Sequence, residues 1–129
     1  MTAQTINTEE IVRKYYELAN KGDWNTWSDL FSLDTVMDEQ LAGHIEGRET
    51  LREMMKGFPD MYASFQNVPQ HYVIGTDGET AAVVTHISAK THDGAVIEAR
   101  VCNYFRVEDG LITYMANYHD TAPFAVLAK

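Results

Sequence analysis

The hydrophobic pattern of this chain changes at Pro59, and that change constrains the fold more than any other feature of the sequence. Before Pro59, apolar residues recur every three or four positions, which is typical of amphipathic helices. After it, apolar and polar residues alternate, which is typical of strands with one buried face. The alternating runs are residues 70–75, 80–90, 95–107 and 111–120. The chain is therefore predicted to form helices first and a sheet afterwards.

Short turns that contain glycine separate the alternating runs. They are Asp77–Gly78, Asp93–Gly94 and Glu108–Asp109–Gly110. A glycine in such a short connection favours a hairpin, because it adopts positive φ angles without strain. The four runs are therefore predicted to follow one another as an antiparallel meander.

Three helices are predicted in the first half of the chain. The first begins with a capping box formed by Asn7 and Glu10 and ends at Gly22. The second, WNTWSDLF, carries two tryptophans that are expected to pack in the core. The third lies between Gly47 and Pro59, and the short extended piece DTVMDEQLAG connects the second helix to it.

This order of elements predicts an α+β fold, in which three N-terminal helices pack on one face of a curved, mostly antiparallel sheet. No linker, repeat or low-complexity tract interrupts the sequence, so residues 1–129 are predicted to form one domain. A chain of 129 residues is long enough to bury one core.

The charge of the chain limits its partners. The sequence has 19 acidic and 10 basic residues, which give a formal net charge of -9. Such a field repels polyphosphates and anionic surfaces. Nucleic acid and membranes are therefore not expected as partners.

The sequence also predicts where the protein works. Cys102 is the single cysteine, so no internal disulfide is possible, which suits a reducing compartment. The N-terminus lacks the pattern of a signal peptide, and no segment approaches the ~20 apolar residues of a membrane span. A cytoplasmic protein is expected.

His119 and Asp120 end the last alternating run. Neighbours on a strand point to opposite faces, so these two side chains are not expected to bind one ion or to work as a pair. Alternation leaves two registers open. Either Met115, Asn117 and His119 face the interior, or Tyr114, Ala116, Tyr118 and Asp120 do. The five histidines show no metal-ligand spacing such as HxxxH or HxH, so no metal is expected.

Four local motifs, in this order, resemble the nuclear transport factor two-like superfamily, whose fold is a cone-shaped α+β barrel of three helices and a strongly bent sheet. The motifs are ANKGDW, LFSLDTVMD, GHIEGRE and EDGLI. A further segment, FPDMYASF, is similar to one in the SnoaL-like polyketide cyclases. In that family an aspartate at the end of the last strand acts as acid and base, and the resemblance assigns this position to Asp120.

Other motifs resemble the ketosteroid isomerases. KYYELANKGD aligns Tyr15 with the oxyanion-hole tyrosine, and TVMD aligns Asp38 with the general-base aspartate. NYFRV aligns Asn103 with an aspartate that is protonated in that family. The asparagine departs from the family pattern, which argues against a steroid substrate. Its amide nevertheless donates a hydrogen bond at any pH.

The resemblance implies a small-molecule isomerase or cyclase that uses no cofactor. A carboxylate in an apolar pocket has a raised pKa, so Asp38 or Asp120 is the predicted base for an enolisable carbonyl substrate. Tyr15 and Asn103 are the predicted stabilisers of the enolate. The predicted substrate-binding residues are His119, Asn117, Trp27 and Phe58.

The expected ligand is a small apolar or polycyclic carbonyl compound, and the resemblance implies a homodimer formed through the outer face of the sheet. An alternative is a non-catalytic ligand-binding module, or a dimeric interaction module, because one fold hosts many functions. Such a module needs the pocket but no acid with a perturbed pKa.

Overall fold

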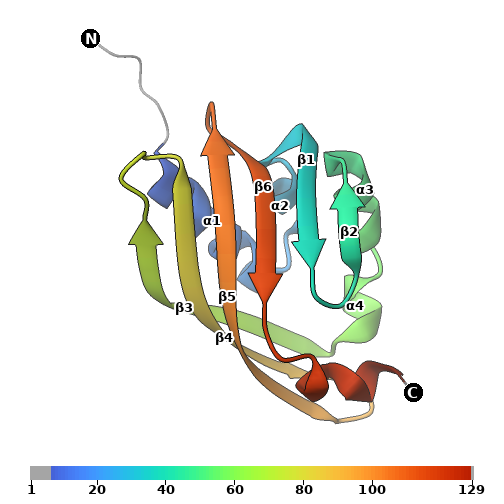
Figure 1. The fold of residues 1–129 in the computed structure, drawn as a ribbon. Coiled ribbons are helices and arrows are strands. Elements are labelled where there is room, and N and C mark those ends of the chain that lie inside the picture. The colour runs from blue at the N-terminus through green and yellow to red at the C-terminus, as the bar shows by residue number, and fades with distance from the viewer. Residues whose placement is uncertain (1–6, 129) are drawn as a thin grey trace.

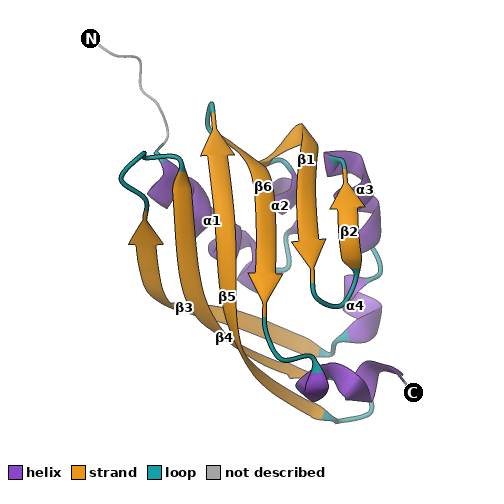
Figure 2. Cartoon of the chain, in the orientation of Figure 1, coloured by secondary structure: helices purple, strands orange, loops and turns teal. Residues whose placement is uncertain are grey.

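The computed structural model describes residues 7–128 as one curved sheet with helices on its inner face (Figures 1 and 2). The helices are α1 (Thr8–Lys21), α2 (Trp24–Ser28), α3 (Arg48–Met55), α4 (Phe58–Met61) and the 3₁₀ helix η1 (Ala122–Ala128). The strands are β1 (Phe31–Glu39), β2 (Gly43–Glu46), β3 (Ser64–Ile74), β4 (Thr80–Lys90), β5 (Val96–Glu108) and β6 (Leu111–Tyr118). The predicted α+β class is confirmed.

The six strands lie in the order β2-β1-β6-β5-β4-β3. β1 pairs with β6 in parallel, and every other neighbouring pair is antiparallel. β2 and β3 are edge strands, so the sheet curves around the helices without closing into a barrel (Figure 1). The predicted meander corresponds to β3–β6, and β1 with β2 extends it on the β6 side.

The structure confirms the predicted capping box and C-terminal glycine of the first helix and the predicted glycine turns of the hairpins. The Glu10 amide donates to Asn7 Oδ1 at 2.8 Å, and the Asn7 amide donates to Glu10 Oε1 at 3.3 Å, which completes the capping box. Gly22 ends α1 in the left-handed conformation, with φ 75°. The β3–β4, β4–β5 and β5–β6 connections each contain a glycine with positive φ, as hairpin turns require.

The third predicted helix is divided in two. α3 ends at Met55, and Pro59 lies in the first turn of the short helix α4 instead of ending α3. Proline is tolerated there because the first turn of a helix leaves its backbone N–H groups unpaired anyway. The break positions Phe58 and Met61 next to the interior instead of continuing the axis of α3.

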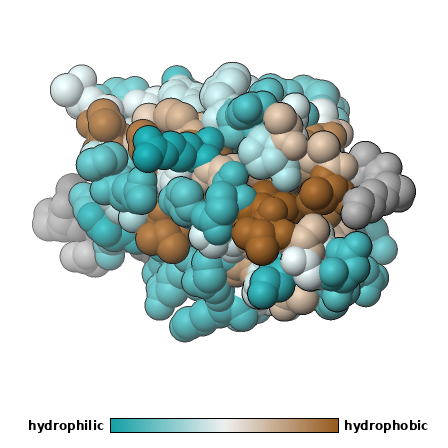
Figure 3. All heavy atoms as spheres, turned by 90° about the horizontal axis from the view of Figure 1, so that it is seen from below, coloured by the Kyte–Doolittle hydropathy of each residue, from teal (hydrophilic) through white to brown (hydrophobic). Residues whose placement is uncertain are grey.

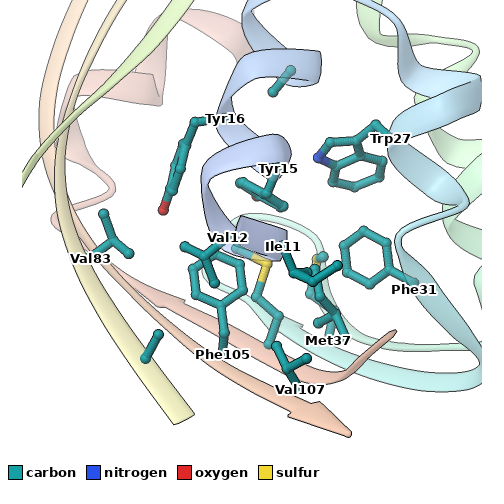
Figure 4. Packing of buried hydrophobic residues seen from close by; sticks show 14 of the residues in the cluster. Ile11, Val12, Tyr15, Tyr16, Trp27, Phe31, Met37, Val83, Phe105 and Val107 are labelled. Carbon is teal, nitrogen blue, oxygen red and sulfur yellow. The ribbon is translucent and has the colours of Figure 1, made fainter. Parts of the chain in front are cut away.

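Aromatic side chains dominate the core between α1 and the sheet (Figure 4). Phe105 of β5 is fully buried, and its ring centroid lies 5.0 Å from that of Tyr15 and 6.1 Å from that of Tyr16. Edge-to-face contacts of this kind stabilise beyond the buried area alone. A second cluster, which includes Ile97 and Phe124, lies where η1 packs against β5.

The outer face of the sheet carries exposed apolar side chains, among them Val84 and Tyr118. The predicted homodimer, which would use this face, stays a prediction. Within residues 7–128, no helix is long and apolar enough to cross a bilayer.

Truncating Phe105 to alanine is expected to lower the free energy of unfolding by about 3–5 kcal/mol, because it removes a fully buried ring and leaves a cavity. Urea unfolding followed by circular dichroism measures the loss. Leu33→Ala is the matched control: Leu33 is 66% exposed, so its truncation should change stability by at most about 0.5 kcal/mol. Similar losses in the two variants would contradict this assignment of the core.

Candidate functional site

The inner face of the sheet and the helices enclose a cavity of about 320 Å³. Apolar side chains, among them aromatic rings and methionines, form most of its wall. A patch of hydrophobic side chains is exposed on the lower face of the molecule (Figure 3). The polar side chains that line the cavity are Glu39, Asn67, Asn103, Asn117 and His119, together with the hydroxyls of Tyr15 and Tyr62. A mainly apolar hollow with a few convergent polar groups is typical of a small-molecule site.

Six of the eight predicted site residues line this cavity. They are Tyr15, Asn103, His119, Asn117, Trp27 and Phe58. Asn117 of β6 and His119, which directly follows this strand, face inward, so the structure has the first of the two registers that the sequence left open. The pairing of Asn103 with Asn117 across β5 and β6 brings both amides to the same side of the sheet.

Asp38 does not line the cavity, which corrects its predicted placement as the pocket base. Met37 and Glu39 on either side of it face inward, and strand alternation therefore turns Asp38 to the outer face. There its carboxylate accepts a hydrogen bond from the Tyr114 hydroxyl at 2.6 Å and lies 2.6 Å from Nδ1 of His44.

Asp120 also lies outside the cavity wall, which corrects its predicted placement at the pocket. It lies two residues beyond the end of β6 and is exposed. Its Oδ1 accepts a hydrogen bond from the Ala122 amide at 2.9 Å, at the start of η1. Asp120 therefore caps the terminal helix and contributes to structure there.

Glu39, which the sequence analysis missed, is the carboxylate of the cavity. Its Oε1 accepts hydrogen bonds from the amides of Leu41 at 2.9 Å and Ala42 at 2.5 Å. Its Oε2 accepts one from Asn117 Nδ2 at 3.2 Å. The missed signal is Met37, because an apolar residue two positions earlier on a strand predicts that Glu39 shares its inward face.

Two tyrosine hydroxyls reach the same space as Glu39. Burial, and then the Glu39 charge, raise the pKa of Tyr15 well above its ordinary value and that of Tyr62 to about 12. Both phenols therefore stay protonated at neutral pH and can donate hydrogen bonds. Neither hydroxyl makes a hydrogen bond within residues 7–128.

Asn103 is 2% exposed, and its partner differs from the expected one. Its Nδ2 donates to the hydroxyl of Tyr16 at 2.6 Å, whereas the sequence analysis grouped it with Tyr15 (the hydroxyl of Tyr16 is visible in Figure 4). Tyr16 is buried against β4 and β5, and burial is the main cause of its raised pKa. This hydrogen bond satisfies two buried polar groups, so Asn103 has a structural role whether or not it also contacts a ligand.

His119 has a defined tautomer. Its Nδ1 lies 2.8 Å from the backbone oxygen of Asp120, which can only accept, so Nδ1 carries the hydrogen. In the neutral imidazole, Nε2 is then the nitrogen with the lone pair, and it has no partner among residues 7–128. The ring also packs on Phe124, with centroids 5.0 Å apart, and this contact fixes its orientation.

No group of three or more histidine, cysteine, aspartate or glutamate side chains within residues 7–128 is arranged to hold a metal ion.

The cluster on the outer face gives a prediction for His44. The hydrogen bonds that His44 donates to Asp38 and then to Glu46 raise the pKa of His44, whereas the hydrogen bonds that Asp38 accepts from Tyr114 and then from His44 lower the pKa of Asp38. The imidazolium stabilises the fold below the ordinary histidine pKa, and this contribution is lost as pH rises through the raised value. The Asp38 contribution is present above the ordinary aspartate pKa and is lost as pH falls through the lowered value.

Asp38→Asn should therefore lower the pKa of His44 toward its ordinary value, measured by NMR titration of the imidazole. The backbone amide resonances of β3, the far edge strand, serve as the internal reference and should be the same in the variant and the wild type. An unchanged pKa of His44 in the variant would show that the ion pair does not form.

The sequence and the fold both have relatives. Residues 12–115 match the family of SnoaL-like domains. No curated protein sequence matches the chain. Among solved structures, an NTF2-like protein of unknown function from Burkholderia pseudomallei K96243 is similar with a TM-score of 0.85 and 19% identity, over 95% of this chain and 97% of that one.

Two further solved structures have names that refer to cyclases. A candidate polyketide cyclase from Pseudomonas putida KT2440 has a TM-score of 0.82 and 18% identity, over 95% of this chain and 98% of its own. The second is the epoxide hydrolase/cyclase-like enzyme SalBIII, which has a role in pyran ring formation in the polyether salinomycin. It has a TM-score of 0.78 and 21% identity, over 89% of this chain and 92% of its own. At these identities the structures show a shared fold. Because the family match covers most of its length, the chain belongs to the SnoaL-like domain family.

Proposed function

We propose that this protein is a cofactor-independent isomerase or cyclase that moves a proton on an enolisable carbonyl compound bound in the cavity. Family membership and the names of structural relatives support the reaction class. The observation that carries the proposal is His119, whose Nε2 has a free lone pair at the wall of an apolar cavity.

His119 is the base of the proposed mechanism. Its Nε2 removes a proton from the carbon next to the carbonyl group, and the electron pair of that C–H bond forms the C=C bond of an enolate. The hydrogen bond from Nδ1 to the Asp120 carbonyl holds the ring in the tautomer that this step needs. The same nitrogen returns the proton to a carbon of the product.

Tyr15 and Tyr62 are the donors for the enolate oxygen. Their raised pKa values keep both hydroxyls protonated, and the hydroxyls have no partner within the described chain that would have to be displaced. Donors oriented in advance in a dry cavity stabilise developing negative charge more than water does. The apolar wall, which includes Trp27 and Phe58, supports binding of a largely hydrophobic ligand.

The test is hydrogen exchange at carbon with a model ketone. Purified protein is incubated with 2-tetralone in D₂O, and proton NMR follows the loss of the α-hydrogen signals. The wild-type protein should accelerate the exchange, and His119→Gln should reduce the acceleration by about 100-fold or more, because a general base contributes at least that much. Tyr15→Phe should reduce it by a comparable factor.

His71→Gln is the matched control, because it changes the same residue type on an exposed part of β3, and it should exchange at the wild-type rate. Exchange that survives in His119→Gln would contradict the assignment of the base. Tight binding of the ketone with no acceleration in the wild-type protein would instead favour the non-catalytic ligand-binding module.

A further inference from the structure

Among residues 7–128, the cavity wall has one carboxylate, that of Glu39, and no lysine or arginine that would form an ion pair with it. Glu39 is half-buried, and within residues 7–128 no lysine or arginine lines the cavity and no ion pair involves Glu39. Its hydrogen bonds come from two backbone amides and the Asn117 amide, which are neutral donors. They orient the carboxylate but leave its charge uncompensated, so the site attracts a cation.

The wall around this carboxylate is unusually rich in aromatic rings. Phe124 lines the cavity beside His119, and six further rings line it as well: Tyr15, Trp24, Trp27, Phe58, Tyr62 and Phe65. These six form a connected group, with ring centroids of Trp24 and Phe58 4.6 Å apart and those of Phe58 and Phe65 4.8 Å apart. The faces of such rings are electronegative, and aromatic walls with a carboxylate are the chemistry that binds ammonium groups.

A further acceptor at the cavity has no hydrogen-bond donor. Asn67 is 7% exposed, and its Oδ1 is buried without a hydrogen-bond partner among the described residues. A buried acceptor without a donor costs free energy, and a ligand with N–H groups would supply the missing donor.

We infer that the ligand of this cavity carries a protonated amine beside its apolar body, and that the ammonium group lies against Glu39 and the aromatic wall. The inference rests on the cavity being the ligand site of the proposed function, but it requires no proton transfer. It also fits the mechanism, because an ammonium group offsets the Glu39 charge, which would otherwise repel an enolate held by Tyr15. The substrate class is then an amine-bearing carbonyl compound.

Three probes of nearly equal shape test the inference at neutral pH. They are 2-naphthylmethylamine, which is a cation, 2-naphthylmethanol, which is neutral, and 2-naphthoate, which is an anion. Isothermal titration calorimetry measures each Kd with the wild-type protein. The amine should bind about tenfold tighter than the alcohol, and the naphthoate should bind more weakly than both.

Glu39→Gln should reduce the preference for the amine over the alcohol to about twofold or less, with little change in the Kd of the alcohol. Glu46→Gln is the matched control: it removes the same charge from an exposed residue outside the cavity and should keep the preference. This pair separates the local effect of Glu39 from the general attraction of cations to a protein of net charge -9.

Several outcomes would overturn the inference. They are no binding of any probe, an amine that binds no tighter than the alcohol to the wild-type protein, and an equal loss of preference in both variants. The comparison of the amine and alcohol Kd values with the wild-type protein tests the inference even if Glu39→Gln fails to fold. His119→Gln should keep the amine preference, so a failure of the exchange experiment with the preference intact would remove the proposed mechanism and leave this inference standing.

Discussion

The parallel pairing of β1 with β6 determines which side chains reach the cavity. Its register sets Met37 opposite Met115 and Asp38 opposite Ala116. At the next position of both strands, the side-chain Nδ2 of Asn117 donates a hydrogen bond to Glu39 Oε2. The Oδ1 of Asn117 accepts a hydrogen bond from the backbone amide of Gln40 at 3.0 Å. A slip of one residue would exchange the inner and outer faces of a strand, and Asp38 would replace Glu39 in the cavity.

This register also explains how the site combines apolar and polar chemistry. Met37, Met115 and Phe105 bury the strands against α1, so this part of the inner face is apolar. Glu39, Asn117 and His119 lie at those ends, where the sheet opens toward the cavity. The rigid part of the sheet therefore carries the packing, and the strand ends carry the groups that contact a ligand.

Much of this fold could be predicted from the sequence, because its signals are local. The capping box at Asn7 and the glycine turns act over three or four residues, and the long alternation of β5 determines that Asn103 and Phe105 face inward. β2 could not be predicted in this way, since its four residues, GHIE, are too short to show a period. The α4 helix was missed because proline signals both the end and the first turn of a helix.

The site was harder to predict for a physical reason. Asp38 and Glu39 are adjacent acids near the end of a strand, and only the pairing with β6 decides which of them faces inward. Asp120 lies two residues beyond the end of β6, outside the ladder, so alternation no longer controls its direction. The family resemblance pointed to the two aspartates. The inward-facing Met37 and Met115, which precede Glu39 and His119 at even spacing, instead indicate that these two side chains line the cavity.

The most direct measurement is the response of the side-chain carboxyl carbons to a cavity ligand, recorded by ¹³C NMR during titration with 2-naphthylmethylamine. The structure predicts that the Glu39 carboxyl resonance shifts as the site saturates, while those of Asp38 and Asp120 stay in place. Saturable shifts at Asp38 or Asp120 with Glu39 unchanged would contradict the account, because they would mean that the opposite faces of β1 and β6 line the binding site.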